Sequence, residues 1–226
     1  MSSISKEEQL YFLISISKGR LSPNATYEQA INYWYHKPQY RDIYDAVVRI
    51  AFTTLARTVR GISRNPNREI LKAEASDYLE NRLKYLSAST ADEFDKWHRE
   101  TSENLIAIFN QYDQAFAVGQ AQKWINMSLK HLSIADKATV TVFYNYCHVP
   151  IDSYILKAMQ SDIVSKEIRA IDAGFEQGKD GIATWSKIES YDTYLKFQKD
   201  FRENCGEAPL DYEFHLWQKQ KDQLSL

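Results

Sequence analysis

A lysine and an aspartate in the middle of the chain are the residues best placed to do chemistry. Lys123 lies in the first turn of a predicted helix that follows a Val-Gly bend, and the partial positive charge of a helix start disfavours an ammonium ion there. A neutral lysine amine is a nucleophile that attacks electrophilic carbon and forms a Schiff base. Asp152 lies two residues after Pro150, at the start of another predicted helix, where its carboxylate stays ionised for electrostatic or general-base work.

Each of the two residues also has an ordinary structural interpretation. A lysine in a first turn is usually a solvated surface charge, and an aspartate shortly after a proline is usually an N-cap. The pair carries more weight than either residue alone, but their separation along the chain does not show whether they meet. We expect a catalytic pair to face one cleft within a few ångströms.

The segments around this pair read mainly as helices. Apolar residues recur with a period near 3.6, and Thr26-Tyr27-Glu28-Gln29 forms a capping box at one helix start. Residues 139–147 are β-branched and aromatic, which fits either a strand or a buried helix. Gly174, Gly178 and Gly181 mark a predicted loop. Helices are predicted over residues 6–19, 27–37, 41–60, 68–86, 91–112, 120–132, 150–159, 185–201 and 209–217.

Length and composition narrow the fold class. With 226 residues, 44% of them hydrophobic, the chain is long enough to bury a core and too apolar to be intrinsically disordered. Its 7 glycines are few for a dinucleotide-binding fold, a P-loop or a many-stranded sandwich, all of which need glycine at tight turns. We therefore expect one mainly α domain over residues 1–226, with a helical part at 1–116 and the candidate site in 117–226.

The sequence also bears on location and cofactors. No apolar run has the length or flanks of a signal peptide or a membrane span, so no membrane partner is expected. Two cysteines, Cys147 and Cys205, suggest reduced thiols in a cytoplasmic protein. The histidines and cysteines lack zinc-type spacing, so neither a metal nor another cofactor is expected.

Three segments resemble DNA glycosylases of the helix-hairpin-helix superfamily. VPIDSYILKA (149–158) is similar to the family segment that carries a catalytic aspartate. VGQAQKWINMSLKHL (118–132) resembles the helix that carries the catalytic lysine in the 8-oxoguanine branch. Residues 208–217 share a Pro-Leu, an acidic residue and a Leu-Trp with the archaeal 8-oxoguanine glycosylases. The resemblance covers about residues 117–217 and implies a helix-hairpin-helix glycosylase fold.

The resemblance implies a reaction and a role for each member of the pair. Such enzymes flip a damaged purine out of the duplex into a pocket between helices. Lys123 would attack C1′ of the sugar, and Asp152 would stabilise the sugar cation and assist deprotonation of the lysine. The glycosidic bond breaks, a Schiff base forms, and β-elimination can follow. Lys130, seven residues after Lys123 on the same helix face, is the alternative nucleophile.

The resemblance also implies residues that bind the flipped base. Trp124 is predicted either to line the base pocket or to pack in the core. His215 is a further candidate for the far pocket wall, and is otherwise a cap or core histidine. The predicted substrate-binding residues are Gln120, Trp124, Phe214 and Trp217.

A basic segment is the predicted DNA-binding surface. Residues 57–72 hold five basic residues and one acidic residue, a net charge of +4 in a chain of net charge −2. Arg57, Arg60 and Arg64 are spaced to share one helical face that could neutralise phosphates, and Arg68 follows them. A solvated surface stripe fits the same pattern.

The hairpin expected from the resemblance is atypical. In the family it reads Leu-Pro-Gly-Val-Gly, and its amides bind a DNA phosphate through a cation. Here Val118 and Gly119 remain, while Gln114, Ala115 and Phe116 replace the other residues. We retain Gly119 as a predicted DNA contact.

These observations predict a DNA glycosylase of the 8-oxoguanine class, with DNA as its partner and with or without lyase activity. The alternative is a non-catalytic helical module of a defence or regulatory system that binds nucleic acid or protein. The atypical hairpin favours this alternative.

Overall fold

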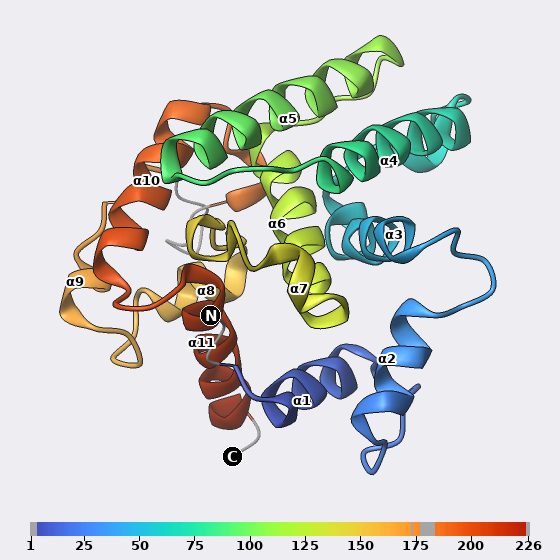
Figure 1. Ribbon diagram of the computed structural model, residues 1–226. Coiled ribbons are helices and arrows are strands. Elements are labelled where there is room, and N and C mark those ends of the chain that lie inside the picture. The colour runs from blue at the N-terminus through green and yellow to red at the C-terminus, as the bar shows by residue number, and fades with distance from the viewer. Residues whose placement is uncertain (1–3, 173, 177–183, 225–226) are drawn as a thin grey trace.

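Helices account for the regular structure of the described part of the chain, and the predicted mainly α fold class is confirmed (Figure 1). The computed structural model describes residues 4–172, 174–176 and 184–224, and no strand occurs among them. The α-helices are α1 (Lys6–Ile16), α2 (Tyr27–Tyr35), α3 (Ile43–Leu55), α4 (Arg68–Lys84), α5 (Ala91–Gln111), α6 (Val118–Ala135), α7 (Lys137–Val140), α8 (Ser153–Ala158), α9 (Lys166–Arg169), α10 (Tyr191–Asn204) and α11 (Pro209–Leu224). Four 3₁₀ turns join them in this part of the chain: η1 (Ala56–Thr58), η2 (Ile62–Arg64), η3 (Tyr144–Tyr146) and η4 (Trp185–Lys187).

Side-chain caps define where several helices begin. Thr26 accepts a hydrogen bond from the amide of Gln29, and the Gln29 side chain accepts one from the amide of Thr26, which confirms the predicted capping box. Ser5 and Glu8 form a second box at the start of α1. Such reciprocal bonds satisfy amides that have no partner inside a helix.

Helix α6 forms the centre of the molecule, with α3 packed along it and α5, α7, α10 and η4 around it (Figure 1). Every residue from Val118 to Ile134 is buried. A helix that is buried on all sides is normally apolar. This one carries eight buried polar side chains that need partners inside the protein. Five of them define the candidate site: Gln122, Lys123, Asn126, Lys130 and His131.

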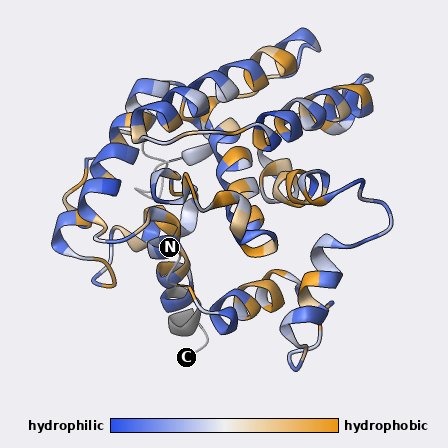
Figure 2. Ribbon diagram, in the orientation of Figure 1, coloured by the Kyte–Doolittle hydropathy of each residue, from blue (hydrophilic) through white to orange (hydrophobic). Residues whose placement is uncertain are grey.

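Two apolar clusters lie on either side of this central helix. The larger one contains residues of α1 to α7 together with Phe214 and Trp217 of α11. The smaller one gathers residues of α8, α9 and α10 around the segment that includes Val149 and Ile151. In Figure 2 orange and blue positions alternate along α4 and α5, as expected for helices with one face against the core.

Segment 139–147 is neither a strand nor one buried helix. It forms the end of α7, an irregular turn and η3. Its side chains at 140, 143, 144 and 147 are buried, a spacing that fits helical turns, while Val142 is 68% exposed. Packing of this helical face therefore outweighs the strand preference of its β-branched residues.

Three other predicted elements differ in extent. The helix predicted over 41–60 ends at Leu55 and continues as η1, and the one predicted over 185–201 is broken between η4 and α10. Helix α8 begins at Ser153 rather than at Pro150. In the predicted glycine loop, Gly174 has a positive φ, whereas Gly178 and Gly181 lie outside the described residues. Within the described part of the chain, no helix combines the length and apolar character needed to cross a bilayer.

Candidate functional site

The structure brings Lys123 and Asp152 together. Lys123 extends from α6 toward the start of α8, and its Nζ lies 2.6 Å from Oδ2 of Asp152. The lysine side chain is 5% exposed and the aspartate side chain 17%. The two candidates therefore form an ion pair near the surface of the core, with a narrow access to solvent.

The two carboxylate oxygens of Asp152 accept hydrogen bonds from different donors. Oδ1 accepts hydrogen bonds from the amides of Tyr154, at 2.8 Å, and Ile155, at 3.1 Å. Oδ2 accepts the bond from Lys123. Asp152 is thus an N-cap, as its ordinary interpretation requires, and also the partner of the lysine. The cap fixes the carboxylate plane and leaves one oxygen aimed at the amine.

The expected position of Lys123 within its helix needs a correction. Helix α6 begins at Val118, so Lys123 is its sixth residue and lies beyond the first turn. The field of a helix start acts mainly within that turn. The surroundings of the lysine are set instead by burial and by the carboxylate of Asp152.

A second lysine forms a deeper ion pair along the same helix. The Nζ of Lys130 contacts Oε2 of Glu213 from α11, and both side chains are almost completely buried. The ammonium lies 4.1 Å from the ring centre of Phe12 and 4.0 Å from that of Phe214. Burial lowers the pKa of Lys130, and Lys123 acts in the same direction, while Glu213 and Asp152 oppose this change. The two pairs thus interact electrostatically.

Lys130, the alternative nucleophile, is less accessible to solvent than Lys123. Lys130 is 1% exposed, and two aromatic rings contact its ammonium group. The two predicted pocket residues of α11, Phe214 and Trp217, belong to this aromatic enclosure. Their ring centres lie 5.4 Å and 5.2 Å from that of Phe12. Lys123, by contrast, borders solvent through Asp152.

We expect the Lys130→Met variant to lose about 3–5 kcal/mol of unfolding free energy, because it leaves the Glu213 carboxylate buried without its counter-ion. The double variant Lys130→Met/Glu213→Leu removes both charges and should recover most of that loss. Urea unfolding of the two variants and the wild type measures this difference. Equal stability of the single and double variants would contradict it.

The two predicted base contacts on α6 have structural partners. Trp124 is fully buried, its Nε1 donates to the carbonyl of Val48 at 2.9 Å, and its ring packs against Phe52 of α3. These contacts favour the core interpretation of Trp124 over its role in a base pocket. Gln120 donates to the carbonyl of Thr58 and accepts a bond from the amide of Ala117, so its amide group stabilises the start of α6.

Gly119 also has a structural role. Its amide donates to the carbonyl of Ile188 at 2.9 Å, and a Cβ at this position would lie 1.8 Å from the carbonyl oxygen of Trp185. The glycine allows the segment between η4 and α10 to approach α6 closely. Because its amide is already bonded, Gly119 does not offer it to a phosphate.

We expect Gly119→Ala to lower the unfolding free energy by about 1–3 kcal/mol or more, because the added methyl overlaps backbone atoms. Gly61→Ala serves as the comparison, since a methyl there meets nothing within 4 Å and only the backbone angle of +84° opposes it. The midpoints of urea unfolding should fall further for Gly119→Ala. The opposite order would show that the close approach matters less than the backbone angle.

The basic segment does not form one helical face. Arg57 lies in η1 and Arg64 in η2, while Gly61, with a φ of +84°, turns the chain between them. All are exposed, as is Arg60, and none of the three arginines has an acidic partner among the residues described. Arg68, at the start of α4, pairs with Glu69. The predicted stripe is therefore a set of exposed arginines distributed over two 3₁₀ turns, the turn between them and the start of α4.

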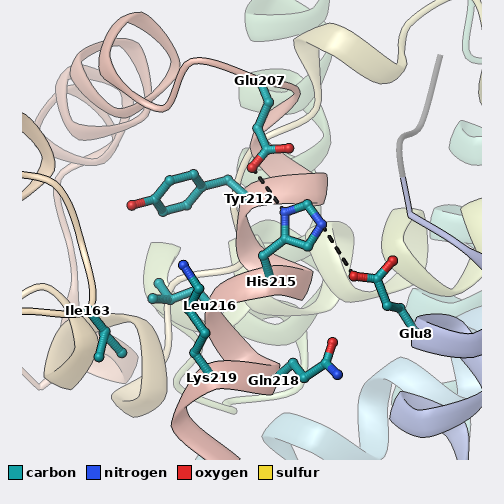
Figure 3. A pocket seen from close by; sticks show the side chains of 8 residues that line it. All are labelled: Glu8, Ile163, Glu207, Tyr212, His215, Leu216, Gln218 and Lys219. Atoms are coloured by element: carbon teal, nitrogen blue, oxygen red, sulfur yellow. Dashed lines mark hydrogen bonds and ion pairs between the residues drawn. The ribbon is translucent and has the colours of Figure 1, made fainter.

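His215 lies on a partly exposed side of α11, where it points toward Glu8 and Glu207 in a surface pocket (Figure 3). Its Nδ1 is 3.1 Å from Oε1 of Glu207, and its Nε2 is 3.4 Å from Oε1 of Glu8 in α1. The side chains of Tyr212 and Lys219 line the same surface pocket (Figure 3). His215 thus links α1 to α11, the two helices whose phenylalanines enclose Lys130.

A further buried polar group anchors the segment before Asp152. His148 contacts Oδ1 of Asp95 at 2.9 Å through Nε2 and the hydroxyl of Tyr194 at 2.9 Å through Nδ1. Arg202 donates to the same oxygen of Asp95. Burial raises the pKa of Asp95, but His148 and Arg202 outweigh it and lower that pKa to about 2.

His131, next to Lys130 on α6, is fully buried and contacts the hydroxyl of Tyr35 at 2.8 Å through Nδ1. Burial, with the charges of Lys130 and Lys123, lowers the pKa of His131 from 6.5 to about 3. The unfolded chain therefore binds a proton at His131 below about pH 6.5, and the folded protein binds it only below about pH 3.

We expect the unfolding free energy to fall as the pH decreases from about 6.5 to about 3, by up to about 5 kcal/mol from His131. The loss is absent above this window and complete below it. His131→Gln should show a shallower decline in urea unfolding across the same pH values. Parallel curves for the two proteins would rule out His131 as a source of the decline.

Sequence reasoning missed three residues that build the site. Glu213 falls in the segment 208–217, where the resemblance offered an acidic residue, whereas no signal pointed to Phe12 or Gln122. Among the residues that the structure describes, no group of three or more His, Cys, Asp or Glu is arranged to hold a metal. Comparison of the chain with protein-family models, with curated proteins and with solved structures finds no match.

Proposed function

We propose that the protein is a DNA glycosylase that removes an oxidised or modified base through a Schiff base on Lys123. The observation that carries the proposal is the contact between a nearly buried lysine and a capped, partly exposed aspartate at 2.6 Å. A nucleophile held beside a base whose own orientation is fixed is the arrangement that covalent catalysis requires.

In the proposed reaction each member of the pair has a separate role. Lys123 must lose a proton before it attacks, and Oδ2 of Asp152 is placed to receive it. The neutral amine then bonds to C1′ of the sugar, and the bond from C1′ to the base breaks. Its electron pair leaves with the base, which takes the proton that the newly bonded nitrogen loses. Asp152 returns its proton to the ring oxygen O4′ as the C1′–O4′ bond breaks, which gives the protonated Schiff base. Loss of a C2′ proton to a base with departure of the 3′-phosphate completes a β-elimination.

The aromatic enclosure around Lys130 is the proposed base pocket. A flipped purine needs aromatic faces for stacking and polar groups at its edge. Phe12, Phe214 and Trp217 supply rings, and Lys130 with Glu213 supplies a donor and an acceptor. Because the rings close over Lys130, entry of a base requires α1 and α11 to move apart.

The exposed arginines offer a surface for the DNA backbone. Residues of the basic segment pack against the start of α6, where Gln114 and Gln120 donate to the carbonyls of Arg60 and Thr58. Arg60 and Lys187 line one surface cavity at this end of the helix. Cations beside the helix that carries the nucleophile could bind phosphates flanking the flipped nucleotide.

Borohydride trapping tests the proposal. The wild-type protein is incubated with duplexes that contain 8-oxoguanine, other modified bases, an abasic site or no damage, and sodium borohydride reduces any Schiff base to a stable adduct. We expect an adduct with the abasic duplex and with at least one damaged duplex, and none with undamaged DNA. Absence of an adduct from every duplex would overturn the proposal.

A non-catalytic nucleic-acid-binding module is the second candidate. The bond from the Gly119 amide to Ile188 favours it, because that amide is then not offered to a phosphate as in the family hairpin. The same panel separates the two functions. Binding to undamaged and damaged duplexes with equal affinity, and with no adduct, would support the module.

A further inference from the structure

Gln122 lies next to Lys123 on α6 and is fully buried. Its Nε2 donates to the carbonyl of Ile151 at 2.8 Å, and its Oε1 accepts a bond from the amide of Ile151 at 3.1 Å. The same Nε2 donates to the carbonyl of Gly119, and Asn126 donates to the same Oε1. Both donors and both acceptor positions of this amide are therefore used, which makes its orientation unique.

Ile151 directly precedes Asp152, in a stretch of chain that has no regular structure between η3 and α8. Buried backbone groups in such a stretch need partners from elsewhere. Gln122 supplies both partners for Ile151. Gln198 of α10 supplies both for Val149, with an amide that donates to its carbonyl and accepts from its N–H, each at 2.9 Å.

The two glutamines differ in what they connect. Gln198 joins the stretch to α10, whereas Gln122 joins it to the residue beside Lys123. A closed ring therefore runs from Lys123 through the peptide bond to Gln122, across two hydrogen bonds to Ile151, through the next peptide bond to Asp152, and back across the ion pair. Movement of Asp152 relative to Lys123 would have to break the bonds of Gln122.

We propose that Gln122 is a positioning residue that holds Oδ2 of Asp152 against Nζ of Lys123. This inference rests on the proposed function for its kinetic consequence, but the geometry that it explains exists without DNA. Preorganised pairs react faster than loose ones, and a displacement of about 1 Å can cost about 100-fold in rate. Gln122 acts through Asp152 and does not itself contact the sugar.

Gln122→Met and Gln198→Met form a matched pair of variants. Both keep the size and shape of the side chain and remove the two hydrogen bonds to the backbone of the stretch. Gln122→Met also removes the bonds to Gly119 and from Asn126, so both variants should lower the urea midpoint, and Gln122→Met by more. Single-turnover trapping on abasic DNA, at saturating protein and corrected for the folded fraction, should fall about 10- to 100-fold for Gln122→Met. Gln198→Met should keep a rate close to that of the wild type.

A second measurement does not depend on activity. Double-mutant cycles of Lys123→Gln and Asp152→Asn give the interaction free energy of the ion pair from urea unfolding. This coupling energy is determined in the wild-type, Gln122→Met and Gln198→Met backgrounds. We expect this coupling energy to fall by at least about half only when Gln122 is replaced, because Asp152 is then no longer held at a fixed position relative to Lys123. If Gln122→Met does not fold, Gln122→Asn and Gln198→Asn replace the pair, since the shorter side chain stays polar but withdraws its amide from the backbone of the stretch.

The outcomes separate the inference from the proposed function. If the wild type forms no adduct, the glycosylase proposal fails, and the coupling measurement alone decides whether Gln122 positions the pair. A loss of coupling confined to Gln122 variants supports the inference in either case. Equal losses of rate and of coupling in the Gln122 and Gln198 variants would overturn it, since both residues would then only support the fold.

Discussion

Replacing Lys123 by glutamine is expected to abolish the borohydride-trapped adduct completely. Glutamine removes the only amine in contact with Asp152 among the residues described, and no Schiff base can form on an amide. The carboxylate keeps its bonds to the amides of Tyr154 and Ile155 and is not left without partners. We therefore expect a moderate loss of about 1–3 kcal/mol in unfolding free energy, the range for a hydrogen bond to a charged group.

The control for this result is the double variant Lys130→Met/Glu213→Leu, which removes the other buried lysine without leaving an unpaired charge. The abasic duplex is the informative substrate, because it needs no base recognition and reports only the amine. The control should form the adduct, and peptide mapping of the wild-type adduct should identify Lys123. An adduct that survives Lys123→Gln and disappears in the control would make Lys130 the nucleophile.

The two lysines differ in how much of their surroundings could be predicted from the sequence. Lys123 and Asp152 fall in segments of recognisable pattern, so they could be selected as a candidate pair although they lie far apart in the chain. Their contact could not be predicted, because it depends on how the stretch before α8 crosses α6. Lys130 and Glu213 lie 83 positions apart in the chain, and no local sequence pattern predicts their contact.

The errors on α6 and in the basic segment have separate physical causes. Helix α6 is buried on every side, so its sequence does not say which neighbours face the site, and Trp124 proved to face α3. The spacing of the arginines implies one face only if the helix continues. Gly61 adopts a left-handed conformation, however, and α3 gives way to 3₁₀ turns. The helix start at Thr26 was predicted correctly, because its capping box is a local interaction.

Substituting Asp152 by asparagine separates the two roles of that residue. Asparagine caps helices about as well as aspartate, so its Oδ1 can keep the bonds to the amides of α8. It cannot take a proton from Lys123, and an NH2 group toward the ammonium would replace the acceptor that is now 2.6 Å away. We expect single-turnover trapping on abasic DNA to fall about 10²- to 10⁴-fold, the range for loss of a positioned base.

Asp152→Ala completes the comparison, because it removes the cap as well as the charge. Its trapping rate should fall by the same factor as that of Asp152→Asn. Its unfolding free energy should be lower than that of Asp152→Asn by about 1 kcal/mol. The rate would then follow the charge of Asp152 while the stability follows its cap. If Asp152→Asn keeps the wild-type trapping rate and only Asp152→Ala is impaired, Asp152 is an N-cap without a catalytic role, and its contact with Lys123 is an ion pair that stabilises the fold.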